Sequence, residues 1–376
     1  MARAEAHLAA RTAGASARAR GGVPTYAAAL KAARSAVGAL VKDRSGVERL
    51  DICNAEGAVL LGWADARVES AVAGADDGRR LQAEAAERIG IFLPCAEAVA
   101  FRSSLNAAMA DALTAAKALT GRDGAFFCDD DTVATGDVDA LSAALDRHAG
   151  QVAAVVIRPM EAEKAFLLAA RRLTSREGAL LLFDESRTAF RMHTGGAQAM
   201  HGVVPDLALL GPSLANGRPI AAVTGRVDAM QCLGSSGAGV PVGALAAACA
   251  TLERIARDDV ADSLTLRGAE IEAEIDARLR ATGADAWFGL FGDPSWSLIA
   301  ARPFEDLDTD TLEAALAEGL YANGVLSFGA HVPSMATGEA AVARLLSAYD
   351  AVLPGLVERA SQGAFTRRLR RSALSR

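Results

Sequence analysis

Short apolar runs alternate with helical patterns through the middle of this chain, and this alternation restricts its fold more than any other feature. Each run is uncharged and bounded by Gly, Asp or Pro, as expected of strands buried on both faces of a parallel sheet. The sequence therefore predicts an α/β fold with a central, mainly parallel sheet. The expected strands are Ala153 to Ile157, Ala179 to Phe183, Leu207 to Leu210 and Ile220 to Thr224, and the expected helices are Leu105 to Leu119, Phe166 to Glu177 and Val242 to Arg257.

The stretch after Arg257 changes to a charged amphipathic helix, then two apolar runs, then two more helices. This order predicts a compact α+β domain. Asp310 and Glu313 stand at capping-box spacing ahead of one of these helices. Strand-like pieces also occur near the start of the chain. The two late apolar runs are Trp287 to Phe291 and Trp296 to Ala301, the helices begin at Leu312 and Ala340, and the early strand-like pieces are Val47 to Ile52 and Ala58 to Leu61.

Composition narrows the class of protein. With 376 residues the chain exceeds the usual size of one hydrophobic core, so a large domain with a smaller companion is expected. The net charge of −7 argues against a nucleic-acid partner. Five scattered cysteines without a CxxC pair indicate free thiols in a reducing compartment. No apolar run reaches the roughly 18 residues of a membrane span, so we expect a cytoplasmic protein with no membrane partner.

Four gapless stretches carry a resemblance to a known family. The longest, ALLLFDESRTAFRMHTGGAQAMHGVVPDLALLGPSLANGRPIAAVTGR, resembles the core of class III pyridoxal-phosphate (PLP) aminotransferases, above all glutamate-1-semialdehyde aminomutases. The resemblance implies a PLP-dependent transferase fold of type I, with both ends of the chain joined in one small domain. The stretches are Ala58 to Gly74, Pro94 to Arg122, Ala179 to Arg226 and Ala315 to Asp350.

The expected domain layout follows from this resemblance together with the patterns above. The Ala- and Arg-rich start of the chain is predicted to be a loose extension, and TRRLRRSALSR at the end to be a basic tail. The predicted segments are 1–22 for the extension, 23–60 for the N-terminal part of the small domain, 61–257 for the large domain, 258–365 for the C-terminal part of the small domain and 366–376 for the tail.

The position that the family uses for its Schiff-base lysine is changed. In the family a lysine follows a Leu-Gly pair, whereas here Leu210-Gly211 is followed by Pro212, and no lysine occurs after Lys164. A proline within a chain has no free amine, so no internal aldimine can form there. The resemblance thus predicts no covalent PLP, and leaves open non-covalent PLP or pyridoxamine phosphate.

Three residues are candidates for cofactor binding. Asp184 follows an apolar run, and the resemblance implies that it pairs with the pyridine nitrogen of PLP. Ser104-Leu105-Asn106 stands where the family has Ser-Gly-Thr at its phosphate turn, so Ser104 and Asn106 are the remaining phosphate ligands. The alternative interpretation is structural: Asp184 caps the following loop, and Ser104 and Asn106 cap a helix.

Other family features are missing or altered. The Tyr-His-Gly segment expected after Phe127 is absent, as though several tens of residues were lost, and GSSGAGVPVG replaces the Gly-Thr by which a neighbouring subunit reaches the phosphate. Arg158-Pro159 replaces Glu-Pro, which puts a cation where the family has an acid. Arg158 and His201 are the remaining catalytic candidates by residue type. Asp129-Asp130-Asp131 is interpreted as a solvated turn, and no metal site is predicted.

Two classes of function remain. In the first, the chain is a pseudoenzyme that acts as a partner subunit, in a homodimer or in a heterodimer with an aminotransferase paralogue. In the second, its pocket performs lysine-independent chemistry on a small biosynthetic metabolite, and residual PLP-dependent transamination is a further alternative. The Ala- and Gly-rich run from Gly239 to Leu252 is a candidate dimer surface. The same run has a second interpretation as an internal core helix.

Overall fold

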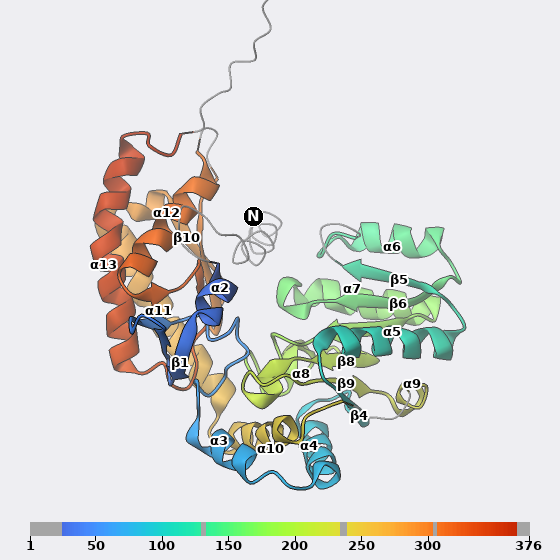
Figure 1. Ribbon diagram of the computed structural model, residues 1–376. Helices are drawn as coiled ribbons and strands as arrows, with labels where there is room; N and C mark the ends of the chain where they lie inside the picture. The colour runs from blue at the N-terminus through green and yellow to red at the C-terminus, as the bar shows by residue number, and fades with distance from the viewer. Residues whose placement is uncertain (1–24, 129–132, 234–238, 304–306, 367–376) are drawn as a thin grey trace, which may run out of the picture.

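The computed structural model describes residues 25–128, 133–233, 239–303 and 307–366. The predicted N-terminal extension, Asp129 to Asp131, the first part of GSSGAGVPVG and the basic tail after Thr366 lie outside the described residues. The remainder forms a larger sheet domain and a smaller domain, which stand side by side in Figure 1.

A six-stranded sheet forms the centre of the larger domain. Its strand order is β4-β9-β8-β7-β6-β5, in which β5 to β8 run parallel and β9 is antiparallel to both of its neighbours. The prediction of a central, mainly parallel sheet is thereby confirmed. The strands are β4 (Ala98–Arg102), β5 (Gly124–Cys128), β6 (Val152–Ile157), β7 (Leu180–Asp184), β8 (Leu207–Leu210) and β9 (Ala221–Gly225).

Side chains of the strands alternate between two helical layers. On β7, Leu182 packs in the cluster that contains the alanines of α5 (Leu105–Thr120), while Leu181 and Phe183 pack in the cluster formed with α6 (Val138–Arg147) and α7 (Lys164–Glu177). This is the period of two that a strand imposes on its side chains. Alanine is the smallest residue that favours a helix, so the alanines of α5 allow it to lie close to the sheet. Both faces are covered, which is why the strands carry almost no charge.

Most of the Ala-rich helix α10 (Val242–Arg257) is buried by other elements of the same chain. Nine of its residues, including Leu245, Leu252 and Ile255, are buried where it packs against α3 (Ala66–Ala73) and α4 (Gly78–Phe92). Figure 1 shows these three helices together below the sheet. The apolar run from Gly239 to Leu252 is therefore mostly covered within its own chain, and the core-helix interpretation is confirmed.

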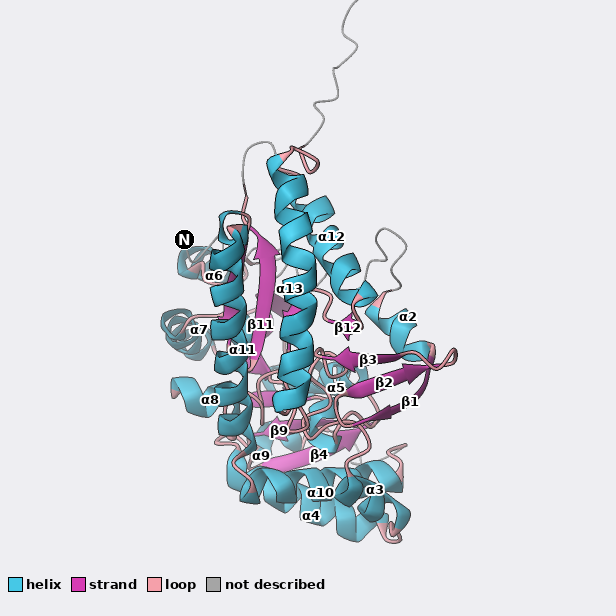
Figure 2. Ribbon diagram, turned by 90° about the vertical axis from the view of Figure 1, so that its left-hand side faces the viewer, coloured by secondary structure: helices cyan, strands magenta, loops and turns pink. Residues whose placement is uncertain are grey.

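The smaller domain joins the two ends of the chain. Strand β12, from the C-terminal part, pairs in parallel with β3, from the N-terminal part, and three long helices pack against its sheets as Figure 2 shows. The sheets have the orders β1-β2-β3-β12 and β10-β11-β13. The strands are β1 (Ala33–Val37), β2 (Leu40–Asp43), β3 (Glu48–Asp51), β10 (Phe288–Asp293), β11 (Trp296–Ala301), β12 (Val325–Leu326) and β13 (Ala330–His331), and the helices are α2 (Tyr26–Lys31), α11 (Val260–Thr282), α12 (Thr309–Ala322) and α13 (Glu339–Ser361).

Helix α13 is long and apolar enough to cross a bilayer by length and composition. Its buried residues, among them Leu345, Tyr349 and Leu353, pack in the core of the smaller domain with α11 and α12. Core helices of this kind satisfy the same criteria as membrane spans. Four short helical segments complete the larger domain, and one lies in the smaller domain. The four are η1 (Pro159–Glu161), α8 (Gly196–His201), η2 (Pro212–Ala215) and α9 (Val227–Met230), and the one in the smaller domain is η3 (Ala284–Ala286).

Two local predictions are wrong. Ala58 to Leu61 is not a strand: the run is buried, but its backbone bonds to loops, with Leu61 N–H donating to Asn216 Oδ1 at 2.9 Å. The capping box at Asp310 is also not formed. Asp308 caps α12 instead, accepting from Thr311 N–H at 3.2 Å, while Glu313 accepts from Ala301 N–H.

Candidate functional site

Asp184 is the last residue of β7 and lies at the carboxyl edge of the central sheet, as predicted. Parallel α/β sheets bind their ligands outside this edge. Its Oδ1 accepts a hydrogen bond from Ser186 N–H at 3.1 Å, so the aspartate does cap the following loop. Its side chain is only 11% exposed. Oδ1 thus binds within the loop, and Oδ2 lies 3.9 Å from Arg158 Nε.

Arg158 occupies the neighbouring position at this edge. It follows β6 directly, and the pairing of Ile157 with Phe183 places Arg158 beside Asp184. Its Nε lies 3.9 Å from Asp184 Oδ2, and its Nη1 lies 3.9 Å from Glu161 Oε1. Both distances exceed the reach of a hydrogen bond. The guanidinium is therefore close to two carboxylates without being bound tightly by either, and its side chain is 55% exposed.

Pro212 lies at the same edge, one strand further along. It opens η2 immediately after β8, which pairs with β7. A Cβ atom at Gly211 would lie 2.8 Å from the Cβ of Ser186, so only glycine allows the two loops to approach this closely. The position that the resembled family gives to lysine is thus beside the loop of Asp184, and it is occupied by a pyrrolidine ring at the start of a 3₁₀ turn.

Ser104 is the N-cap of α5. Its Oγ accepts from Ala107 N–H at 3.3 Å, which is the helix-cap role that the sequence left open. Asn106 is exposed on the first turn, and no hydrogen bond of its side chain occurs within the described part of the chain. Strand β4 is separated from β7 by β9 and β8, so Ser104 lies about 14 Å from Asp184 along the sheet edge.

His201 is not brought together with Asp184 and Arg158. It is the last residue of α8, and no hydrogen bond or ion pair joins it to either residue in the described ranges. Burial lowers its pKa, and the positive charge of Lys164 lowers it further. Of the two catalytic candidates, only Arg158 lies beside Asp184.

Glu185 was missed by the sequence analysis. It is fully buried and accepts from Ala197 N–H at 2.8 Å and from Gln198 N–H at 3.0 Å, and also from the hydroxyl of Thr188. Burial raises the pKa of its carboxyl group. These bonds tie the loop after β7 to the start of α8, and so fix the direction in which the loop leaves Asp184.

Two further arginines on this loop connect it to the smaller domain. Arg187 lies over the ring of Trp296, with its Cζ 5.3 Å from the ring centroid. Arg191 is 1% exposed, and its Nη1 donates to Ser295 O at 3.2 Å and Pro333 O at 2.8 Å, while its Nη2 donates to Gly57 O at 3.1 Å. Burial lowers the pKa of Arg191 to about 9. The guanidinium therefore joins three segments through their carbonyl groups.

A left-handed turn lies at one of these segments. Asn54, Ala55, Glu56 and Gly57 have φ values of 45°, 54°, 52° and 81° in succession. Side chains cost free energy in this conformation, and such strain persists only where the surroundings enforce it. The buried carboxylate of Asp51 accepts from the N–H groups of Cys53 and Asn54, and Gly57 packs against Trp296 and Arg191. The turn exposes Glu56 next to the Trp296 contact.

Comparison with known proteins supports one family. The sequence profile described as aminotransferase class-III matches residues 129–289. The glutamate-1-semialdehyde 2,1-aminomutase of Roseiflexus castenholzii is 30% identical over 414 residues, covering 92% of this chain and 94% of that protein. The Neisseria meningitidis serogroup C aminomutase is 27% identical over 398 residues, covering 86% and 91%. Both alignments are longer than the chain itself, so the relatives contain segments that this chain lacks.

Solved structures agree on the fold. A transaminase with PLP bound superposes with a TM-score of 0.80 at 23% identity, covering 96% of this chain and 99% of the other. The FumI protein of Sphingopyxis sp. MTA144, in its PLP internal aldimine form, has a TM-score of 0.80 at 23% identity, with 95% and 97% covered. An omega-transaminase from Sphaerobacter thermophilus has a TM-score of 0.76 at 25% identity, with 86% and 91% covered.

Proposed function

The chain belongs to the class III aminotransferase family, and from this premise we propose that it is a member without lysine-dependent transamination that acts as a partner subunit. The observation that carries the proposal is Pro212, which stands directly after Leu210-Gly211 at the carboxyl end of β8. The lysine of this family holds PLP and moves the proton between substrate and cofactor. Loss of such a positioned base lowers a rate by about 10²- to 10⁴-fold.

The other residues at this edge do not fit PLP held as in a lysine-bearing enzyme. When bound, PLP supplies an electron sink that depends on a protonated pyridine nitrogen facing an aspartate. Here Asp184 already has the guanidinium of Arg158 at 3.9 Å, and a second cation beside it is disfavoured by like-charge repulsion. The hydroxyl of Ser104 is used in capping α5. Asp184 instead accepts from Ser186 N–H and so orients the loop that follows β7.

A partner role is compatible with a fold that stays intact without the lysine. The buried contacts of Arg191 join the loop after β7 to the smaller domain, and the apolar cluster around α10 includes Leu214 and Ala215 but not Pro212. The same proposal includes three further points. Any PLP or pyridoxamine phosphate binds non-covalently, the protein is cytoplasmic, and it forms either a homodimer or a heterodimer with an aminotransferase paralogue. Most of α10 is covered by its own chain, so only the exposed start of this run, at Pro241 and Val242, is left as a surface for a partner.

Light scattering tests the partner role. Purified protein is measured alone and after mixing with each class III paralogue encoded in the same genome. We expect a mass of two chains in one of these conditions, because oligomers of this kind are most often twofold symmetric dimers. A monomer in every condition would contradict the partner role.

A second function is favoured by one specific observation: two arginines without close ionic partners, Arg158 and Arg187, lie at the carboxyl edge of neighbouring strands. This arrangement suits a pocket that binds a small metabolite without lysine chemistry. In that case a monomer would be expected in the scattering measurement.

A further inference from the structure

The arginines at the carboxyl edge differ from those elsewhere on the sheet in how they are paired. Arg171 and Arg226 both bind Asp206, with N to O distances of 2.8 Å and 2.9 Å. Among the described residues, the nearest carboxylate oxygens lie 3.9 Å from the Arg158 guanidinium. Its N–H donors are therefore left without a protein acceptor at hydrogen-bond distance, within the residues that the structure describes.

Arg187 is the second such group. Across the described ranges its guanidinium has no carboxylate within 4.0 Å, and its recorded contact is with the face of the Trp296 ring. A guanidinium that stacks on an aromatic face keeps its N–H groups in its own plane, where they remain available to an oxygen acceptor. The side chain is half-buried. Arg187 is thus oriented by Trp296 and still able to bind an anion.

The two side chains come from adjacent places. Strands β6 and β7 are neighbours, and Arg158 follows one strand while Arg187 stands three residues beyond the end of the other. Met160, two residues after Arg158, packs in the same apolar cluster as Trp296. Trp296 lies under Arg187, so both arginines border the contact between the two domains. Arg187 is half-buried there, and partial burial strengthens charge interactions relative to water.

We propose that Arg158 and Arg187 form a non-covalent site for a small oxyanion, the carboxylate or phosphate group of a metabolite. This proposal rests on the proposed function. If PLP were held at this edge, as by a lysine at position 212, it would take the space that the oxyanion needs. An oxyanion at about 2.8 Å attracts a guanidinium roughly 1.4-fold more strongly than one at 3.9 Å, so a ligand displaces the loose contacts of Arg158 with Asp184 and Glu161.

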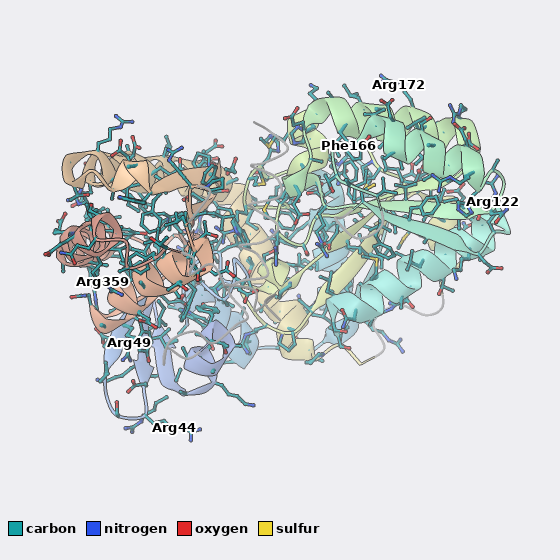
Figure 3. The ribbon with its side chains drawn as sticks, turned by 90° about the horizontal axis from the view of Figure 1, so that it is seen from above. Arg44, Arg49, Arg122, Phe166, Arg172 and Arg359 are labelled. Carbon is teal, nitrogen blue, oxygen red and sulfur yellow. The ribbon has the colours of Figure 1, made fainter. Side chains whose placement is uncertain are left out.

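Titration calorimetry of the full-length protein without PLP tests this site. The probes are inorganic phosphate and succinate, with sodium chloride at equal ionic strength as the reference. Arg158→Gln and Arg187→Gln are each expected to weaken binding by about 10- to 100-fold, the range for a hydrogen bond to a charged group. Arg172→Gln is the matched control, because Arg172 is exposed on the outer side of α7, as Figure 3 shows, and the same charge is removed there.

Asp184→Asn is expected to have the opposite effect. It removes a negative charge beside Arg158 and should therefore tighten anion binding. Binding of phosphate alone assigns a phosphorylated ligand, and binding of succinate alone assigns a carboxylate. Binding of both supports a general oxyanion site. No heat at millimolar concentrations of either probe, or binding that Arg158→Gln and Arg187→Gln leave unchanged, overturns the proposal. A lysine adduct of PLP would contradict the proposed function only, because this titration contains no PLP.

Discussion

At the scale of single residues, Arg191 bears most on how the site is held. Its guanidinium donates to three carbonyls from three segments, and it has no acidic partner within salt-bridge distance in the described chain. Arg191→Met would leave these buried carbonyls without a donor. Each hydrogen bond to a charged group contributes about 1.5–3 kcal/mol. We expect a loss of about 3 kcal/mol or more in the free energy of unfolding.

Urea unfolding followed by circular dichroism measures this loss. Arg172→Met removes an arginine of the same kind from the exposed face of α7 and is expected to change stability by less than about 0.5 kcal/mol. Equal effects of the two substitutions would show that the carbonyl contacts of Arg191 contribute little.

At the scale of elements, the left-handed turn of residues 54–57 stores backbone strain. Ala55 has φ of 54°, a conformation that costs an L-residue roughly 1–2 kcal/mol and costs glycine nothing. Ala110 lies exposed in the middle of α5, where glycine costs about 1 kcal/mol relative to alanine. Ala55→Gly is therefore expected to be neutral or stabilising, and Ala110→Gly destabilising, with a difference of about 1–2 kcal/mol in thermal unfolding. A larger loss for Ala55→Gly would argue against the strain.

The elements also show what the sequence can predict. The strands β6 to β9 were placed within one residue because apolar runs between Gly, Asp and Pro leave little choice, and α10 was placed at its observed ends. Ala58 to Leu61 was misassigned because its burial resembles that of a strand, whereas its backbone partner Asn216 lies far along the chain. Tertiary partners of this kind leave no local pattern.

The sequence likewise predicts those site residues that stand at strand ends, but not those whose contacts join the two domains. Asp184 was predicted because it follows an apolar run, whose end is visible in the sequence, and Arg158 because Arg158-Pro159 replaces the Glu-Pro of the resembled family. Trp296 was identified only as part of a strand, and Arg187 not at all, because their contact joins two domains. His201 was proposed by residue type alone, and residue type does not reveal position.

At the scale of the whole molecule, the described chain keeps a two-domain architecture in which both ends of the sequence share one sheet. β12 pairs with β3, and Arg191 joins the loop after β7 to carbonyls on either side of it. Figure 3 shows Arg122 at the outer end of the larger domain and Arg359 at the opposite end, on the smaller domain. The carboxyl edge of the central sheet, with Asp184, faces the junction between the two domains. Parallel α/β sheets bind their ligands outside this edge, and the fold leaves it in place.

The central claim is that no lysine of this chain holds PLP. The lysines are Lys31, Lys42, Lys117 and Lys164, all of which precede β7, and only Lys164, at the start of α7 after β6, lies near the carboxyl edge. Incubation with PLP, reduction with borohydride and peptide mapping by mass spectrometry test this directly, with Lys164→Met as the control for adventitious labelling. We predict no lysine labelled near one equivalent per chain. One equivalent of pyridoxyl group on a single lysine would contradict the account.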